Sequence, residues 1–157
     1  MSLSLTKGSQ VVDLGEVDVT DGIAPVEFVA PAVGEWTLVA TAEPSGTEVQ
    51  VPVRVAKADA KITSIRVTPK KVIAQKTKAG VTVRVRSAGD FANGKVQIKA
   101  AGKTYTQKLR DGVARFTLKR FKKPGKATLR VTYLGDDATT MARDSVSFRV
   151  VKKNKKK

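Results

Sequence analysis

The sequence of 157 residues contains no cysteine and no histidine. It therefore cannot form a disulfide, a thiol nucleophile, an imidazole general base, a Ser-His-Asp triad or a zinc finger. The longest apolar run, around Phe28 to Val33, is too short to cross a bilayer, so we expect no transmembrane segment. These absences exclude most enzyme classes, and we expect a chain that is not an enzyme and has no catalytic residues, metal site or cofactor.

No basic and apolar leader opens the chain at Met1 to Leu3. From these residues alone, we expect either a cytosolic protein or an excised piece of a larger one. The composition, 41% hydrophobic and 28% charged, is typical of a globular chain with one large domain or two small ones.

Positive charge is in large excess but unevenly placed. The whole chain has 30 lysines and arginines against 14 acidic residues, a net charge of +16. Residues 1–56 contain two cations and eight acids, a net charge of −6, whereas residues 57–157 contain twenty-eight cations and six acids, a net charge of +22. Such asymmetry indicates two units. We predict a partial acidic domain at 1–56, a short linker at 57–61, a basic domain at 62–151 and a Lys-rich tail at 152–157.

Apolar residues alternate with polar ones in both halves, which predicts β-strands. Turn-forming pairs such as Asp111-Gly112 and Pro124-Gly125 separate the runs, and no segment of ten residues shows a helical stripe. Short alternating strands with this spacing are typical of an antiparallel β-sandwich or barrel. The clearest alternating runs are 36–40, 49–55, 81–86, 96–100, 114–119, 127–133 and 146–150.

The two halves are related by an internal repeat. Asp21-Gly22 aligns with Asp111-Gly112 at an offset of 90 residues, and Gly34 aligns with Gly125 at an offset of 91. Residues 3–8 align with 96–102, but nothing in the first half matches 61–93. We therefore expect a complete second domain and a first domain that lacks its opening strands. An incomplete sandwich exposes an unpaired edge, which predicts self-association through the first domain.

Several segments of the second half share turn and core signals in a recognisable order. They are Val67–Val72, Lys78–Val83, Gly94–Ile98, Gly102–Tyr105, Asp111–Ala114, Pro124-Gly125 and Val131–Asp136. This order resembles a bacterial immunoglobulin-like repeat, and more narrowly the lysine-rich repeats at the carboxyl ends of secreted actinobacterial nucleases and nucleotidase-type hydrolases. The resemblance implies all-β, tandem Greek-key sandwiches outside the cytoplasm, the first one truncated. It also implies a non-catalytic appendage, with any catalytic part upstream of Met1.

The cations of the basic half are candidates for binding a polyanion. Strand alternation predicts that they lie on the outer faces of the two sheets, and the excess exceeds the net charge of about 2–8 that solubility needs. An anionic partner would relieve their repulsion and release counterions. The alternative is a solubilising surface that protects strand edges. The predicted residues are Arg84, Arg86, Arg115 and Lys119 on one face, Lys99, Arg130 and Arg149 on the other, and Lys152 and Lys153 in the tail.

Base-specific nucleic-acid recognition is not predicted. Phe116, Tyr133 and Phe148 are in the inward phase, and no recognition helix is present in the pattern. Among the aromatics of the basic half, only Phe91, Tyr105 and Phe121 are candidates for exposure. We expect any contact with nucleic acid to be made to phosphate, and teichoic acid, acidic polysaccharide or an anionic membrane surface would serve equally well.

Two further features are candidate sites. The turn Gly135-Asp136-Asp137, with Asp144 downstream, offers carboxylates for calcium, but it lacks the spacing of a dedicated cage and a cleft for acid–base chemistry. Trp36, the sole tryptophan, is a candidate platform for a sugar, but its alternation with Leu38 predicts a core position. The sequence thus favours a spacer and electrostatic anchor of a secreted or cell-wall-associated protein. A stalk without a ligand and a carbohydrate-binding module are the alternatives.

Overall fold

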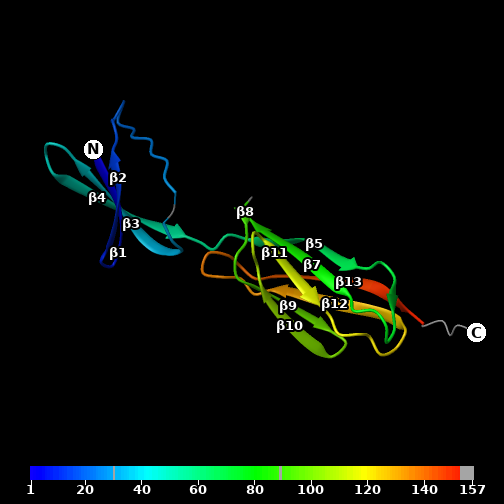
Figure 1. Cartoon of the computed structure of the whole chain (residues 1–157). Coiled ribbons are helices and arrows are strands. Elements are labelled where there is room, and N and C mark those ends of the chain that lie inside the picture. The colour runs from blue at the N-terminus through cyan, green and yellow to red at the C-terminus, as the bar shows by residue number, and fades with distance from the viewer. Residues whose placement is uncertain (30, 89, 153–157) are drawn as a thin grey trace, which may run out of the picture. The chain divides into compact units, whose positions relative to one another are not determined.

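The computed structural model describes residues 1–29, 31–88 and 90–152, and within them it contains strands and turns but no helix. The chain divides into two compact units, Met1–Lys57 and Ala58–Lys157, hereafter unit 1 and unit 2. The all-β, antiparallel fold class predicted from alternation is confirmed. The described residues contain thirteen strands, most of which are labelled in Figure 1.

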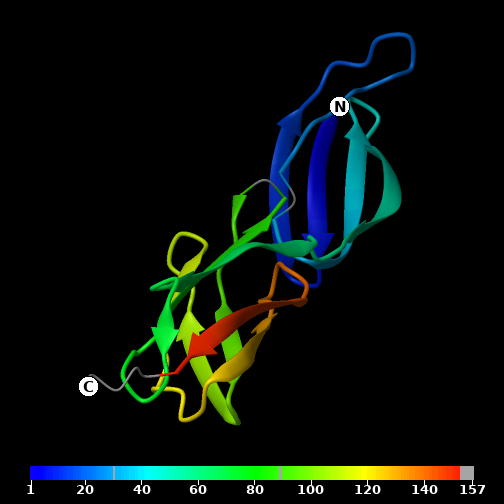
Figure 2. The same ribbon diagram turned by 90° about the vertical axis from the view of Figure 1, so that its right-hand side faces the viewer.

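Unit 1 is a single antiparallel sheet of four strands in the order β2-β1-β3-β4. These strands lie side by side in Figure 2. A long segment, residues 17–33, connects the second strand to the third, and its described residues contain no strand longer than one bridge. The strands are β1 (Ser2–Lys7), β2 (Gln10–Glu16), β3 (Gly34–Ala42) and β4 (Thr47–Val55).

One face of this sheet is apolar. The register places Leu5 beside Leu38, and Leu38 beside Val51, so these side chains lie in one row across three strands. Leu5 is fully buried, whereas Val51 is 47% exposed. Trp36, which shares this face, is buried, and its Nε1–H donates to the carbonyl of Ala32 in the connecting segment. The connecting segment therefore covers part of the apolar face and leaves the β4 side open.

Unit 2 contains two sheets. The first has the order β11-β7-β5, and the short strand β8 also pairs with β7. The second has the order β10-β9-β12-β13-β6, in which the last pair is parallel and the others are antiparallel. The strands of the first sheet are β5 (Ala60–Thr68), β7 (Gly80–Ser87), β8 (Asp90–Phe91) and β11 (Val113–Thr117). Those of the second are β6 (Val72–Ile73), β9 (Lys95–Ala100), β10 (Lys103–Lys108), β12 (Gly125–Tyr133) and β13 (Ala142–Val151).

The core of unit 2 is formed by the inward-facing residues of both sheets. Val81, Val83 and Val85 of β7 are at most 1% exposed, and they belong to one apolar cluster with Ile98 of β9 and Val131 of β12. Because the side-chain period of a strand is two, the intervening arginines and lysines point outward. Consecutive strands cross repeatedly between the sheets, as in an immunoglobulin-like Greek key. Unit 2 is thus the predicted sandwich.

The internal repeat is visible in backbone conformation. The turns at Asp21-Gly22 and Asp111-Gly112 have matching positive φ angles, 52° and 78° against 49° and 69°, and each is closed by an isolated bridge. Gly34 and Gly125, which begin β3 and β12, both have φ of 139°. The sheet order β2-β1-β3-β4 then corresponds strand for strand to β10-β9-β12-β13.

The correspondence between the two units is interrupted directly after the turn at Asp21-Gly22. Residues 24–28 align with β11, yet they contain no strand. The reason is the missing partner: β11 is held by hydrogen bonds to β7, and the described part of unit 1 contains no counterpart of β7. Without a neighbour to satisfy its backbone groups, an alternating sequence does not form a strand.

Candidate polyanion-binding surface

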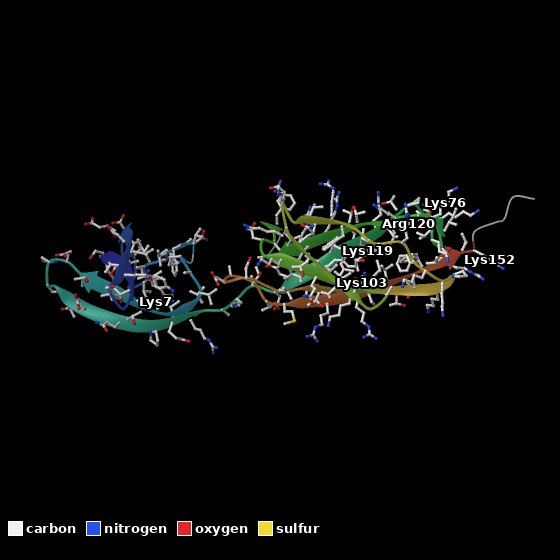
Figure 3. All side chains as sticks on the ribbon, turned by 60° about the horizontal axis from the view of Figure 1, so that its bottom comes forward. Lys7, Lys76, Lys103, Lys119, Arg120 and Lys152 are labelled. Atoms are coloured by element: carbon white, nitrogen blue, oxygen red, sulfur yellow. The ribbon has the colours of Figure 1, made fainter. Side chains whose placement is uncertain are left out.

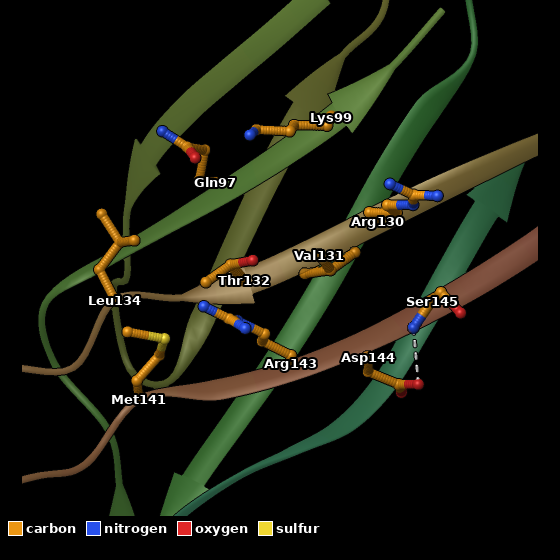
Figure 4. Close-up of a pocket in the computed structure, with 10 residues that line it drawn as sticks. All are labelled: Gln97, Lys99, Arg130, Val131, Thr132, Leu134, Met141, Arg143, Asp144 and Ser145. Carbon is orange, nitrogen blue, oxygen red and sulfur yellow. Dashed lines mark hydrogen bonds between the residues drawn. The ribbon is translucent and has the colours of Figure 1, made fainter.

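The outer face of the five-stranded sheet brings predicted cations together. Lys99 on β9 lies directly opposite Arg130 on β12, and Arg130 lies directly opposite Ser145 on β13. In the next row Thr132 lies opposite Gln97 on one side and opposite Arg143 on the other. Figure 4 shows these side chains across the three strands. Three cations thus lie within two adjacent rows of one surface.

These rows line a shallow hollow of about 660 Å³. Its polar lining consists mainly of side chains that can donate to an anion, including Gln97, Lys99, Arg130 and Arg143. Asp144 is the acidic residue in the lining, and its Oδ1 accepts a hydrogen bond from the backbone N–H of Ser145 (2.7 Å). The hollow is open and broad, which suits an extended polymer better than a small enclosed molecule.

Sequence reasoning missed two members of this face. Arg149, which was predicted, lies opposite Lys126 on β12, and Arg143 shares its face through the alternation of β13. Strand alternation could have identified both residues. Counting back in steps of two from Arg149 reaches Arg143, and counting back in steps of two from Arg130 reaches Lys126. The predicted strands simply began too late to include Arg143.

The outer face of the three-stranded sheet carries a second group of cations. Arg115 on β11 and Arg66 on β5 both lie opposite Thr82 of β7, so they flank the same central residue. Arg84 follows two residues later on the same face of β7. The guanidinium of Arg86 lies 5.5 Å from the centre of the Phe91 ring, over an aromatic side chain that is 54% exposed.

Lys119 is not on that face. Alternation from Arg115 predicted it there, but β11 ends at Thr117 and the chain turns away. The backbone N–H of Lys119 donates instead to the hydroxyl of Tyr105 on β10 (3.1 Å), across the edge of the sandwich. Lys152 is exposed just after β13, and Lys153 lies outside the described residues.

The described cations of these faces form no ion pair within 4 Å. Among the described residues, the ion pair within 4 Å joins Arg54 Nε to Glu35 Oε1 (3.4 Å), and it lies in unit 1. Arg84, Arg115, Arg130 and Arg149 therefore have no carboxylate partner in the described part of the chain. Their repulsion disfavours the compact state, and an external anion would offset it.

The acidic turn after β12 has a structural role. Asp136 Oδ1 accepts hydrogen bonds from the Thr139 hydroxyl (2.7 Å) and the Ala138 N–H (3.0 Å), and its Oδ2 accepts one from the Tyr133 hydroxyl (3.3 Å). Partial burial acts to raise the pKa of Asp136, but these hydrogen bonds outweigh it and the pKa lies below its ordinary value. In the described residues, no three acidic side chains converge as a metal site.

The aromatic side chains are mostly internal. Trp36 is 3% exposed, as alternation predicted, and Lys7 Nζ lies 5.5 Å from its ring centre. The ring face of Trp36 is therefore not available for stacking on a sugar. Phe116 and Tyr133 are buried in the core of unit 2, and Phe121, a candidate for exposure, is also buried. Phe91, which is 54% exposed beside Arg86, is the exception on these two faces among the described residues. A series of exposed rings, which stacking on a single strand uses, is not found in the part of the chain that the structure describes.

Comparisons with known proteins add little. No protein-family model and no curated protein matches the chain. Among solved structures, it is similar to the fibronectin(III)-like modules of Clostridium thermocellum CbhA, with 16% sequence identity and a TM-score of 0.44. That match covers 96% of this chain and 78% of the other. At this level the similarity says nothing about ligands or activity.

The arrangement of the described cations can bind negative charge. The two basic faces present ammonium and guanidinium donors on rigid strands, which fit phosphate, sulfate or carboxylate oxygens. No described helix is long and apolar enough to span a membrane.

Proposed function

We propose that the chain is a non-catalytic immunoglobulin-like accessory module of a larger secreted or cell-wall-associated protein. Unit 2 acts as an electrostatic anchor that holds this protein on a polyanion such as teichoic acid, acidic polysaccharide or nucleic-acid phosphate. The module also serves as a spacer. We also propose that the module is related to the lysine-rich repeats of secreted actinobacterial hydrolases, because its sequence resembles them.

The observation that carries the proposal is the direct opposition of Lys99 and Arg130. Like charges placed opposite each other on a sheet destabilise it, typically by a few tenths of a kcal/mol up to about 1 kcal/mol. Neither has a carboxylate partner among the described residues, although a serine and threonines occupy neighbouring positions. A surface that needed only solubility would not concentrate its charge in this way, since interspersed charges serve that purpose.

The test is chromatography of the full chain on immobilised heparin and on DNA-cellulose, with elution by a salt gradient. We expect retention beyond physiological salt on both, because the binding is to charge and not to base sequence. A deletion of residues 152–157 separates the faces from the tail. Retention that survives this deletion supports a site on the sandwich, whereas loss of retention moves the site to the tail.

A double variant, Arg130→Ser with Arg149→Ser, then tests the five-stranded face. The matched control is Lys70→Ser with Lys71→Ser, which removes the same charge from the loop before β6. We expect the face variant to elute at clearly lower salt than the control. Equal elution of both would indicate a diffuse charge effect, and no retention of the wild type near physiological salt would leave a stalk as the function.

A further inference from the structure

A second, smaller cavity lies at the open edge of the unit 2 sandwich. It has a volume of about 440 Å³ and lies between β10 and the segment 118–123, which follows β11. These two elements belong to the edges of opposite sheets, so the cavity opens where no strand closes the sandwich. Lys103, Lys119 and Arg120, which lie around it, are labelled in Figure 3. We refer to it as the edge cleft.

The wall formed by residues 118–123 is fixed by hydrogen bonds on several sides. The N–H of Leu118 donates to the carbonyl of Ala79 (2.8 Å), and the N–H of Gln75 donates to the carbonyl of Phe121 (2.8 Å). Arg120 Nε donates to the carbonyl of Lys76 (3.1 Å). With the bond from Lys119 to Tyr105, the segment is held to three other parts of the unit. Its cations are therefore presented from an ordered backbone, which lowers the entropy cost of binding.

Charge in the edge cleft is of one sign. Five cations line it, Lys103, Lys119, Arg120, Lys122 and Lys123, and the lining includes no carboxylate. Lys103 and Lys119 both line the cleft, and repulsion by the Lys119 ammonium is the main cause that lowers the pKa of Lys103. Two ammonium groups that line one cleft favour an anion that accepts hydrogen bonds from both.

The floor of the edge cleft is apolar. Leu118, Ala100 and Phe121 contribute to it and are themselves at most 7% exposed, while Tyr105 is half-buried beside them. Phe121 is fixed from behind by an edge-to-face contact with Phe148, with ring centres 5.4 Å apart. A ligand that fits this site combines a compact anionic group with a flat or apolar body. The edge cleft also lacks the carboxylate, Asp144, that lines the hollow on the five-stranded face.

We propose that the edge cleft binds a phosphate monoester, with the phosphate between Lys103 and Lys119 and the ring of its carrier against Tyr105 and Leu118. A phosphate monoester carries a charge of about −1.5 to −2 at neutral pH and presents three acceptor oxygens, which suits two converging ammonium groups. This site is independent of the proposed anchoring function, because its residues lie at the edge of the sandwich and not on the faces.

The experiment is a titration of the full chain with phenyl phosphate, followed by ¹H–¹⁵N chemical shifts and calorimetry. We expect the largest shifts at the backbone amides of Lys119 and Leu118. Inorganic phosphate should bind more weakly because it leaves the apolar floor uncovered, and phenyl sulfate, which carries one charge, should bind about tenfold more weakly than phenyl phosphate. Glucose 6-phosphate distinguishes a sugar carrier from an aromatic one.

Variants complete the test. Lys103→Ser and Lys119→Ser should each weaken phenyl phosphate binding about tenfold, as expected for loss of one charged hydrogen bond. Lys108→Ser and Lys70→Ser remove the same charge outside the cleft and should leave binding nearly unchanged; all four side chains are exposed, so folding should be preserved. Equal losses in all four variants, equal binding of phenyl sulfate, or shifts confined to β9 and β12 would overturn the proposal. Because retention on heparin is measured separately, either proposal can fail without the other.

Discussion

Lys99 and Arg130 face each other directly across β9 and β12, with no carboxylate partner in the described part of the chain. Replacing Lys99 with Glu converts this repulsion into a cross-strand ion pair. We predict that K99E stabilises the protein by about 0.2–1 kcal/mol while lowering the salt concentration needed for elution from heparin. Thermal unfolding followed by circular dichroism and heparin chromatography measure the two effects.

The matched control for this exchange is Lys70→Glu, which makes the same charge change in a loop. It should lower retention less and should not reproduce the gain in stability. If K99E instead leaves retention unchanged, the face formed by β9, β12 and β13 is not part of the binding surface.

The hydroxyl of Tyr133 lies 2.6 Å from the Thr139 hydroxyl, and both bond to Asp136. Tyr133 is fully buried, so removal of its hydroxyl leaves Thr139 with one partner fewer inside the protein. We predict that Tyr133→Phe destabilises the protein by about 1–2 kcal/mol. Urea denaturation gives the change, and Tyr105→Phe, at a half-buried site, is expected to cost less.

Asp136 makes stability depend on acid pH. Its pKa in the folded state lies below its ordinary value, so the unfolded chain binds the proton first as pH falls. The stabilisation is complete above the unfolded pKa, about 3.9, and is lost as the pH falls through the lower folded pKa. Asp136→Asn should reduce stability at pH 7 and flatten this decline. A decline of the same steepness in wild type and variant would show that other carboxylates cause it.

The repeat supplies a matched pair of glycines. Gly112 and Gly22 are at equivalent turn positions with φ of 69° and 78°, but an added Cβ would meet the Val85 carbonyl at 2.7 Å in the first and nothing within 4 Å in the second. We predict that Gly22→Ala costs about 1–2 kcal/mol from its backbone conformation. Gly112→Ala costs more, because a steric clash is added. Trp36 fluorescence follows unit 1, and circular dichroism follows the whole chain.

The uncovered part of the unit 1 sheet predicts association. Val49 and Val51 of β4 are 59% and 47% exposed on the apolar face, where the equivalent face of unit 2 is covered by β5, β7 and β11. We predict concentration-dependent self-association in sedimentation velocity, which Val51→Asp should weaken. Gln50→Asp places the same new charge on the other face of β4 and should have little effect. A chain that stays monomeric at high concentration would contradict this prediction.

The sequence indicated seven of the thirteen strands of the described residues and the direction of most of their side chains, because both depend on local alternation. Arg84, Arg115 and Arg130 lie outward and Trp36 inward for this reason. The sequence did not single out β2, β5 or β10, whose alternation is weaker. The uneven distribution of charge and the internal repeat could also be recognised in the sequence. The matching positive φ angles at Asp21 and Asp111 agree with the repeat. The same alternation also places Lys126 and Arg143, which were not predicted, on the outer face.

Only the tertiary structure decided which strands are neighbours, and with them the sites. Lys99 and Arg130 are thirty-one residues apart in the sequence and become opposite partners through hydrogen bonds between β9 and β12. Lys119 lies away from its predicted face because β11 ends at Thr117, and it lines the edge cleft together with Lys103, an arrangement that no local pattern encodes. Residues 24–28 resemble a strand yet form none, because a strand requires a partner for its backbone groups. Alternation sets which way a side chain points, whereas pairing between distant segments sets what it meets.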